Sequence, residues 1–563
     1  MNTHDYLQVA LYVVALIVLT PILGGFMARV LQGERHLLSR PLGWLERGIY
    51  RLTGVDQSEE SHWKTYAWAL LAFNFFGFLA VFLLQMLQQW LPLNPQHFPA
   101  VSWHSSFNTA VSFMTNTNWQ GYAGETTLSY LTQMLGLTAQ NFVSAATAIC
   151  VLLALVRGFT RRTAHTVGNF WADLVRSTVY ILLPLSIVLT TALVSEGVVQ
   201  TNSSYETVTT LEGREQTIPL GPAASQIAIK QLGTNGGGFF NANSAHPLEN
   251  PTPLSNFLEM LAILLLPATL TYTYGKMIGN RKHGWLIFGV MLLFWIGGLT
   301  ASLYAEYSHN EVTGTTVNME GKEVRFGVTN SVIWSTATTC ASNGSVNAMH
   351  SSLTPLAGGV AMFNIMLGEI VFGGVGCGLY GMVLFIMLTV FLAGLMVGRT
   401  PEYLGKKIEA RDIQMVIVAI VAPGAALLVL AGISAVVTPG LSGLANAGPH
   451  GLSEILYAFA SGVGNNGSAF AGLNANTVYY NVLMALAMLI GRFTVLLPVL
   501  AIAGYMGAKK ISPTSAGTFS TNSGIFAILL VGVILIVGAL TFFPALLLGP
   551  GVEHFLMNAG QSF

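Results

Sequence analysis

The sequence predicts an all-α integral membrane protein with ten transmembrane helices. Its 563 residues are 53% hydrophobic and only 9% charged, whereas soluble domains carry about 25% charged residues. Ten apolar stretches are long enough to cross a bilayer core, which takes about 20 residues per helix. An uncharged segment rich in Asn and Gly recurs four times between these stretches. The formal net charge is zero, which removes the electrostatic basis for binding nucleic acid.

The ten predicted spans follow one another along the whole chain. They cover residues 6–30, 63–90, 128–156, 170–194, 254–278, 285–304, 354–397, 413–437, 478–506 and 524–548. All but four of the 24 Lys and Arg residues lie up to residue 64 or within 157–176, 276–282, 399–411 and 492–510. The positive-inside rule places this set on the cytoplasmic side. With an even number of spans, both termini and all four Asn/Gly segments are then expected on the outer side.

The chain between residues 63 and 510 reads as four repeats of one unit. Each unit has a span, a short moderately polar helix, an Asn/Gly loop and a second span; the short helices are expected at 105–114, 223–232, 331–339 and 452–462. Aligned on Asn118, Gly236, Gly344 and Gly467, the loops recur at intervals of 118, 108 and 123 residues. Such repeats are common in transporters. The expected parts are an N-terminal helix with a basic loop (1–62), four repeats (63–169, 170–283, 284–411, 412–510) and a C-terminal helix (511–563).

The loops have the chemistry of an alkali-cation site. A short helix entering from outside points its C-terminal end, with about half a negative charge, toward the bilayer centre. Backbone carbonyls, with Thr and Asn side-chain oxygens, replace the hydration shell of such an ion. A divalent ion would need carboxylates, and the loops have none. Glycines there can also serve close helix packing alone, but four copies on one side favour a site. This chemistry does not choose between potassium and sodium.

Long motifs along nearly the whole chain carry a resemblance to a known family. They are TNTNWQ (115–120), GETTLSY (124–130), GTNGGGFFNAN (233–243), NMEGKEVRFG (318–327), GEIVFGGVGCGLYGM (368–382), GRTPEYLGKK (398–407) and NNGSAFAG (465–472). The chain resembles the potassium-binding A subunits of bacterial Kdp potassium-transporting P-type ATPases. The resemblance implies K+ as the ion and the membrane–pore–membrane repeats of the Trk/Ktr superfamily. It also implies a bacterial inner-membrane complex with the P-type ATPase (B) subunit and the smaller C and F subunits, surrounded by membrane lipid.

Carried over position by position, the resemblance implies a K+ selectivity filter with three residues from each loop. The set is Asn116, Thr117 and Asn118; Thr234, Asn235 and Gly236; Ser342, Asn343 and Gly344; and Asn465, Asn466 and Gly467. The first loop departs from the others by placing Asn118 where they have glycine, so we expect an asymmetric site. Gln120, just outside the filter, is expected to tune affinity.

The seventh predicted span contains a glycine-rich interruption at 368–378, which would break a helix. One reading is a kink that allows close packing. The other, suggested by the likeness to the loops of Trk-type transporters, is a gate, with Glu369, Gly373 and Gly374, that blocks free conduction. Glu369 is an intramembrane acid and therefore a functional candidate. Arg492, inside the ninth span, would repel a cation at the inner exit, and Arg399 either does the same or extends its charge to the interface.

The sequence has no motif that would let this chain hydrolyse ATP itself. It contains no G-x-x-x-x-G-K-[ST] loop, and none of its four Asp residues begins a D-K-T-G phosphorylation motif. The leading hypothesis is therefore a non-catalytic, potassium-binding subunit of an ATP-driven pump. The alternative is a stand-alone Trk/Ktr-like K+ channel or symporter subunit. A secondary transporter of an organic solute would need charged or aromatic groups at a midplane cavity, which the four loops lack.

Overall fold

The computed structural model describes residues 1–398, 400–512 and 519–561, and this part of the chain contains ten helices able to cross a membrane. The ten predicted spans are confirmed, with ends that differ by a few residues in most cases. They are α1 (Thr3–Leu31), α3 with η1 (Trp63–Trp90), η2 with α6 (Thr132–Thr160), α7 to α8 (Phe170–Ser195), α10 (Pro253–Met277), α11 (Arg281–Glu306), α14 (Cys377–Met396), α15 (Ala410–Ser434), α18 (Val478–Gly507) and α19 to α20 (Gly524–Asn558). The seventh begins at Cys377 rather than residue 354, because Pro355–Met366 is a separate short helix, and the tenth continues to Asn558 rather than ending at residue 548.

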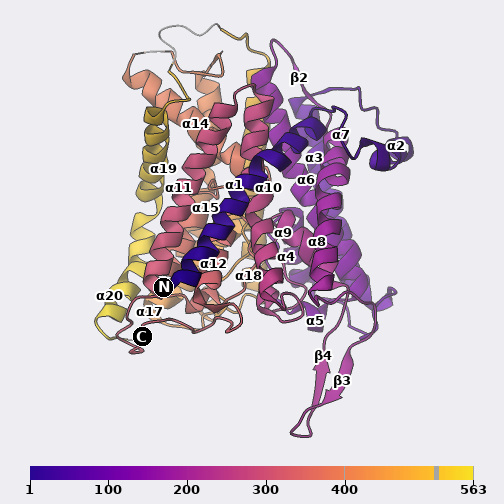
Figure 1. Cartoon of the computed structure of the whole chain (residues 1–563), viewed down its shortest axis with the longest axis vertical. Coiled ribbons are helices and arrows are strands. Elements are labelled where there is room, and N and C mark those ends of the chain that lie inside the picture. The colour runs from indigo at the N-terminus through magenta and orange to yellow at the C-terminus, as the bar shows by residue number, and fades with distance from the viewer. Residues whose placement is uncertain (399, 513–518, 562–563) are drawn as a thin grey trace.

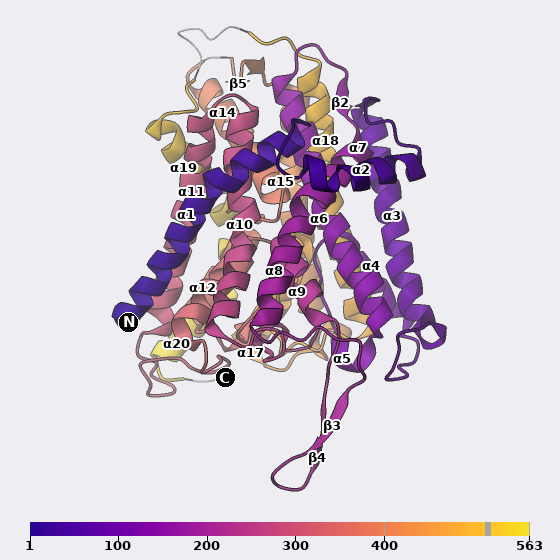
Figure 2. The same cartoon turned by 45° about the vertical axis from the view of Figure 1, so that its right-hand side comes forward.

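The spans run side by side along the long axis of the molecule (Figure 1). Both termini lie at the lower end in Figures 1 and 2, as an even number of spans requires. The hairpin of β3 (Glu206–Thr209) and β4 (Glu215–Ile218) projects from the same end. The opposite, upper end holds α2 (Ser39–Thr53) and the basic connections between spans. The two ends therefore differ in charge as the sequence predicts.

Burial separates the two spans of every repeat. The second spans, α6, α10, α14 and α18, are buried over 83%, 78%, 61% and 61% of their most apolar windows. The first spans, α3, α7–α8, α11 and α15, are buried over 22%, 44%, 44% and 33%. In all four repeats the second span therefore lies nearer the centre of the bundle and the first nearer the surrounding lipid. This shared pattern supports the four-repeat organisation, with α1 and α19 outside it.

Four short helices lie between the spans of the four repeats, where the sequence predicts them. They are α4 (Trp103–Met114), α9 (Ala223–Leu232), α12 (Gly327–Cys340) and α17 (Gly448–Gly464). At a rise of about 1.5 Å per residue, such helices reach only part of the way into a core about 30 Å thick. Figure 2 shows them in the lower half of the bundle. Their C-terminal ends, and the loops that follow, therefore lie at membrane depth, where only surrounding protein can satisfy the backbone.

The seventh span is broken, as the glycine-rich interruption predicts. The helix α13 (Pro355–Met366) ends, residues 367–376 form an irregular segment, and α14 begins at Cys377. The backbone has positive φ at Gly368 (84°), Gly373 (67°) and Gly376 (90°), which no right-handed helix allows. Glu369 and Phe372 also have positive φ, 52° and 61°. We call residues 367–376 the break segment.

The remaining elements are short. They are α5 (Gly124–Thr127), α16 (Thr438–Leu441), the 3₁₀ turns η4 (Asn243–Ala245) and η5 (His350–Ser352), and the wider π-helical turns η2 (Thr132–Thr138), η3 (Ser177–Leu182) and η6 (Leu547–Gly551). Three antiparallel two-stranded pairs join β1 (Ser61–His62) to β2 (Thr166–Gly168), β3 to β4, and β5 (Glu402–Tyr403) to β6 (Lys406–Lys407). In the β3–β4 pair, Glu206 faces Ile218 and Thr209 faces Glu215.

Candidate functional site

The four Asn/Gly loops leave their short helices with the same backbone geometry. The first loop residue is left-handed in every case, with φ of 66° at Asn116, 50° at Thr234, 53° at Ser342 and 58° at Asn465. The N–H of the second residue then donates to the carbonyl five residues earlier. These bonds are Thr117 to Ser112 (2.9 Å), Asn235 to Lys230 (2.8 Å), Asn343 to Thr338 (3.2 Å) and Asn466 to Ser461 (2.8 Å). This is the Schellman geometry that ends a helix at a left-handed residue.

The third residue of each loop is left-handed again. Its φ is 54° at Asn118, 82° at Gly236, 84° at Gly344 and 99° at Gly467, while the second residues have negative φ. Alternation in the sign of φ rotates each peptide plane relative to the last, so successive carbonyls can turn to the same side. Glycine takes positive φ freely, and Asn is the side chain that tolerates it best. Asn118 therefore aligns with three glycines because all four positions require a positive φ.

The loops contact one another in a closed ring. A Cβ at Gly236 would overlap the Asn343 carbonyl oxygen of the third loop, and one at Gly344 would overlap the Asn466 carbonyl oxygen of the fourth. A Cβ at Gly467 would overlap the Thr117 carbonyl oxygen of the first. The chain order of the loops is thus also their order around the ring. Three glycines are required because each abuts the next loop's backbone.

Side chains close the same ring. Asn116 Nδ2 donates to the Thr234 carbonyl at 2.8 Å, and Ser342 Oγ donates to the Asn465 carbonyl at 2.8 Å. Asn465 Nδ2 then donates to Thr117 Oγ1 at 3.0 Å, which joins the fourth loop to the first. Each of these bonds links neighbouring loops. The ring is held by hydrogen bonds between loops as well as by its helices.

The second residues of the loops direct their side chains into the protein. Asn235 Nδ2 donates to Asn116 Oδ1 at 2.5 Å, Asn343 Nδ2 to the Lys230 carbonyl at 3.1 Å, and Asn466 Nδ2 to the Thr338 carbonyl at 2.9 Å. From the sequence, Asn and Thr side-chain oxygens are expected to serve as ligands. In the structure the Nδ2 atoms of these side chains brace neighbouring loops and helices, whereas Asn235 Oδ1 is buried and has no hydrogen-bond partner among the described residues.

The main-chain carbonyls of the second residues in all four loops have no hydrogen-bond donor among the described residues. Thr117, Asn235, Asn343 and Asn466 are each 0% exposed. Their carbonyl oxygens accept no hydrogen bond from the part of the chain that the structure describes. A buried carbonyl without a partner is costly, and nearly all are paired in folded proteins. Four of them at equivalent positions in one ring, beside four helix C-termini, suit a dehydrated monovalent cation.

Gln120 clamps the first loop to the second. Its Nε2 donates to the Gly238 carbonyl at 3.1 Å, and its Oε1 accepts from the Gly238 N–H at 2.9 Å. Asn118 Nδ2 donates to Asn141 Oδ1 of α6 at 2.7 Å, which explains how the first loop accommodates a side chain at its third position. Gln120 thus acts on the ring through the backbone of the second loop.

The break segment lies against the inner end of the ring, at the residues that directly follow the short helices. The Val375 N–H donates to Thr234 Oγ1 at 2.9 Å. A Cβ at Gly374 would lie 3.3 Å from Ser342 Cβ and 3.4 Å from Thr234 Oγ1. At Gly373, a Cβ would overlap the Glu369 carbonyl. Gly373 and Gly374, both singled out in the sequence analysis, therefore allow the break segment to fold tightly and to approach the ring.

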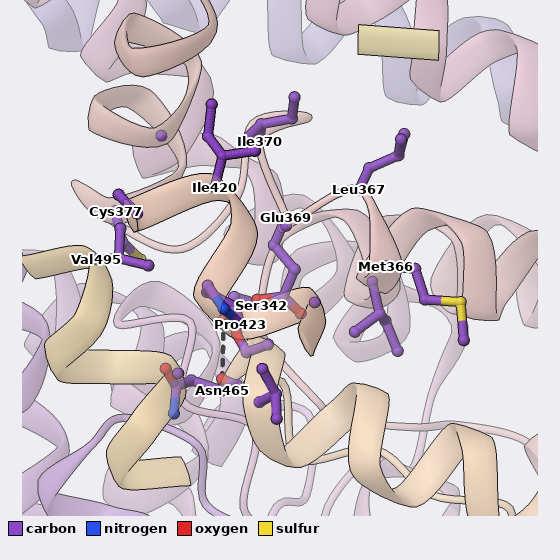
Figure 3. A pocket seen from close by; sticks show the side chains of 18 of the residues that line it. Ser342, Met366, Leu367, Glu369, Ile370, Cys377, Ile420, Pro423, Asn465 and Val495 are labelled. Atoms are coloured by element: carbon purple, nitrogen blue, oxygen red, sulfur yellow. Dashed lines mark hydrogen bonds between the residues drawn. The ribbon is translucent and has the colours of Figure 1, made fainter. Parts of the chain in front are cut away.

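A cavity of about 120 Å³ lies beside this contact, and two buried ionisable side chains are among the residues that line it; Figure 3 shows Glu369 there. Glu369 and Arg492 line it, with Ser342 and Asn465 of the ring. Glu369 is 3% exposed and its Oε1 has no hydrogen-bond partner in the described residues. Arg492, 5% exposed, donates to the Ser144 carbonyl at 3.3 Å. Arg399 lies outside the described residues.

Sequence reasoning missed an ion pair behind the ring. Lys230 of α9 pairs with Glu249, and both side chains are 0% exposed. The Lys230 carbonyl accepts from the Asn235 N–H at 2.8 Å and from Asn343 Nδ2 at 3.1 Å. The backbone carbonyl of Lys230 thus braces two loops, while its side chain ties α9 to Asn243 and Glu249, which follow the second loop. The available signal was a lysine inside an otherwise uncharged short helix between two spans. By charge pattern alone, Lys230 is only one of the four basic residues outside the main basic set.

Known proteins are similar to this chain over nearly its full length. The family described as "Potassium-transporting ATPase A subunit" matches residues 10–555. Proteins named potassium-transporting ATPase potassium-binding subunit are similar throughout. Those from Methylorubrum extorquens and Bradyrhizobium diazoefficiens are each 55% identical and align with 100% of this chain and with 99% and 100% of their own lengths. The one from Sorangium cellulosum is 56% identical and aligns with 99% of this chain and 100% of its own length.

Among solved structures, the potassium transporter TrkH from Vibrio parahaemolyticus superposes on 74% of this chain and 82% of its own length, with a TM-score of 0.49 and 14% identity. The family match covers nearly every residue, and the relatives exceed half identity over their full lengths. The chain belongs to the potassium-transporting ATPase A subunit family.

Proposed function

We propose that this chain binds K+ in the four-loop ring and passes it to a P-type ATPase subunit for ATP-driven uptake. One observation carries the proposal: four buried carbonyls, at Thr117, Asn235, Asn343 and Asn466, have no partner in the described residues. The flanking residues that complete the filter are Asn116 and Asn118, Thr234 and Gly236, Ser342 and Gly344, and Asn465 and Gly467. Gln120 tunes affinity by fixing the spacing of the first two loops.

The choice of K+ rests on the relatives, whose names state potassium binding. The chemistry of the ring agrees with that choice. Neutral oxygens in a braced ring suit a monovalent ion that gives up its water. Within the described residues no group of three or more His, Cys, Asp or Glu could hold a metal ion, so a multivalent ion has no comparable site there.

The inner end of the ring is proposed as the barrier to free conduction. Gly373 and Gly374 let the break segment approach Thr234 and Ser342. Arg492 places a buried positive charge at the same cavity, and a cation leaving the ring directly would be repelled there. Glu369, in the same cavity, supplies a carboxyl for an ion that has passed the ring. Direct exit is thereby opposed, and the ion leaves through the partner.

The proposed partners are the ATPase (B) subunit and the smaller C and F subunits of a Kdp-type complex in a bacterial inner membrane. The end of the molecule that holds α2 faces the cytoplasm, and the end that holds both termini faces outward, because the basic connections gather at the former. The chain contributes ion selection, and the partner contributes ATP hydrolysis.

The test compares the complete complex with this chain alone. The purified complex should hydrolyse ATP in response to K+ and not to Na+. This chain alone, reconstituted in liposomes, should conduct K+ far more slowly than an open channel. Rapid, ATP-independent K+ flux through the chain alone would instead favour the alternative of a stand-alone channel or symporter subunit.

A further inference from the structure

Two adjoining hollows open on the periphery of the helix bundle, between α3, α15 and α18. They lie at the end that carries the basic connections. The hollow nearer that end has a volume of about 290 Å³ and the one deeper along the helices about 440 Å³. Trp63, Lys64 and Tyr505 line both, so the two form one groove. We call it the α3–α18 groove.

The end of the groove is basic. His62, Lys64, His165 and Arg411 line it, and no acidic side chain does so among the described residues. Lys64 has no carboxylate within 4.0 Å in the described chain, and its Nζ lies 5.8 Å from the Trp63 ring centroid. Arg411 is 4.8 Å from the Tyr505 ring centroid. Its ion pair with Glu409, at 3.4 Å and half exposed, is of the weak surface kind.

The deeper part of the groove is apolar on all three helices. Trp68 lies one turn below Lys64, Met415 lies one turn below Arg411, and Ala501 lies one turn below Tyr505, and all three line it. Trp68 is 72% exposed. Gly504 leaves room for the Trp63 ring, because a Cβ there would lie 2.5 Å from Trp63 Cγ. The aromatic ring therefore lies against α18 and separates the basic end from the apolar part.

We propose that the α3–α18 groove binds one anionic phospholipid. Its phosphate contacts Lys64 and Arg411, and one acyl chain lies along Trp68, Met415 and Ala501. Basic pockets between helices at the cytoplasmic surface favour anionic headgroups, and Trp and Tyr are the residues that occupy the interface. A free phosphate would use the basic end alone, whereas the apolar extension of the same groove is accounted for only by a lipid.

The test titrates dioleoyl phosphatidylglycerol onto the complete complex in mild detergent, with bound lipid counted by native mass spectrometry. Lys64→Ala/Arg411→Ala should weaken binding about 30-fold, because each basic side chain near an anionic lipid contributes about 1 kcal/mol. The matched control is Arg40→Ala/Arg51→Ala, which removes two exposed charges from α2 at the same end. The control should bind as the parent does, and dioleoyl phosphatidylcholine should not compete.

Two further measurements distinguish a bound lipid from free phosphate and from a partner helix that covers the groove. Ala501→Leu fills the apolar part, so it should weaken lipid binding while leaving the weak binding of inorganic phosphate unchanged. Equal effects of the two double variants, or phosphate binding as strong as lipid binding, would overturn the proposal. So would a complex that takes up no lipid while this chain alone does, because a partner helix would then occupy the groove. None of these outcomes depends on K+ binding in the ring.

Discussion

Replacing Gly236 by alanine should damage the proposed K+ site, because the structure leaves no room for the added methyl group. The added Cβ would overlap the Asn343 carbonyl oxygen and would lie 2.5 Å from both the Asn343 carbonyl carbon and the Ser345 nitrogen. These atoms cannot rotate away, because they are backbone. Asn343 is also held by its bond to the Lys230 carbonyl at 3.1 Å. The third loop must therefore move as a unit.

The size of the effect follows from this displacement. Side-chain carbons essentially never approach other atoms closer than 3.0 Å, so the Asn343 carbonyl carbon must shift by at least about 0.5 Å and its oxygen by more, which exceeds the tolerance of about 0.5 Å of a preorganised site. Losing one of four carbonyl contacts to a charged group costs about 1.5–3 kcal/mol, or about 10- to 140-fold in K+ affinity. The positive φ of 82° adds about 1–2 kcal/mol of strain for alanine.

The assay is K+ binding by calorimetry on the purified complex, with the K+ concentration for half-maximal ATP hydrolysis measured in parallel. The same titrations with Rb+ and NH4+ should show weaker discrimination. Gly297→Ala on α11 is the matched control, because a Cβ there meets no heavy atom within 4 Å. Thermal unfolding verifies that both variants fold. A folded Gly236→Ala complex with parental affinity and selectivity would refute the placement of Gly236 in the site.

Three other perturbations test different parts of the site. Lys230→Met leaves Glu249 buried without its partner and should lower the unfolding free energy by about 3–5 kcal/mol; an unchanged melting temperature would contradict the role of the ion pair in holding α9 in place. Glu369→Gln should reduce K+-stimulated ATP hydrolysis about tenfold or more, the scale of one lost contact to a charged group, with K+ affinity in the ring retained; parental turnover would exclude the carboxyl. Burial alone would lower the pKa of His450, but its hydrogen bond to Glu553 and that carboxylate's charge outweigh burial and raise it above the ordinary 6.5. The contact between α17 and α20 should therefore stabilise the protein fully below pH 6.5 and lose that contribution as pH rises through the folded pKa; His450→Gln should flatten this dependence in melting temperatures measured from about pH 5 to 9.

The sequence predicts much of the fold because the bilayer restricts what a chain can do. A span needs about 20 apolar residues, so the ends of the ten helices follow from hydropathy, and the break at 367–376 follows from its glycines. The loops are found for a similar reason, since positive φ at membrane depth selects residues such as Gly236 and Asn118. These are local constraints, and local sequence records them.

What the sequence does not record is which loops are neighbours. The side chains of Asn343 and Asn466 look like ligands in isolation, and they become braces only because Lys230 and Thr338 of other segments offer carbonyls. The Lys230–Glu249 pair likewise depends on how the chain folds back after the second loop. Residue type indicates a polar group at depth, but its role is decided by contacts between repeats.

Hydrogen bonds also connect the first two loops to the residues proposed as the barrier. Ser144 Oγ donates to Asn116 Oδ1 at 2.7 Å, and the Ser144 carbonyl accepts from Arg492 at 3.3 Å. On the opposite side, Thr234 Oγ1 accepts the Val375 N–H of the break segment. Asn116 and Thr234 are themselves joined by a hydrogen bond at 2.8 Å. A movement of the break segment or of Arg492 would therefore strain the first two loops, so opening the proposed barrier would carry a free-energy cost at the ring, which the proposed partner would have to supply.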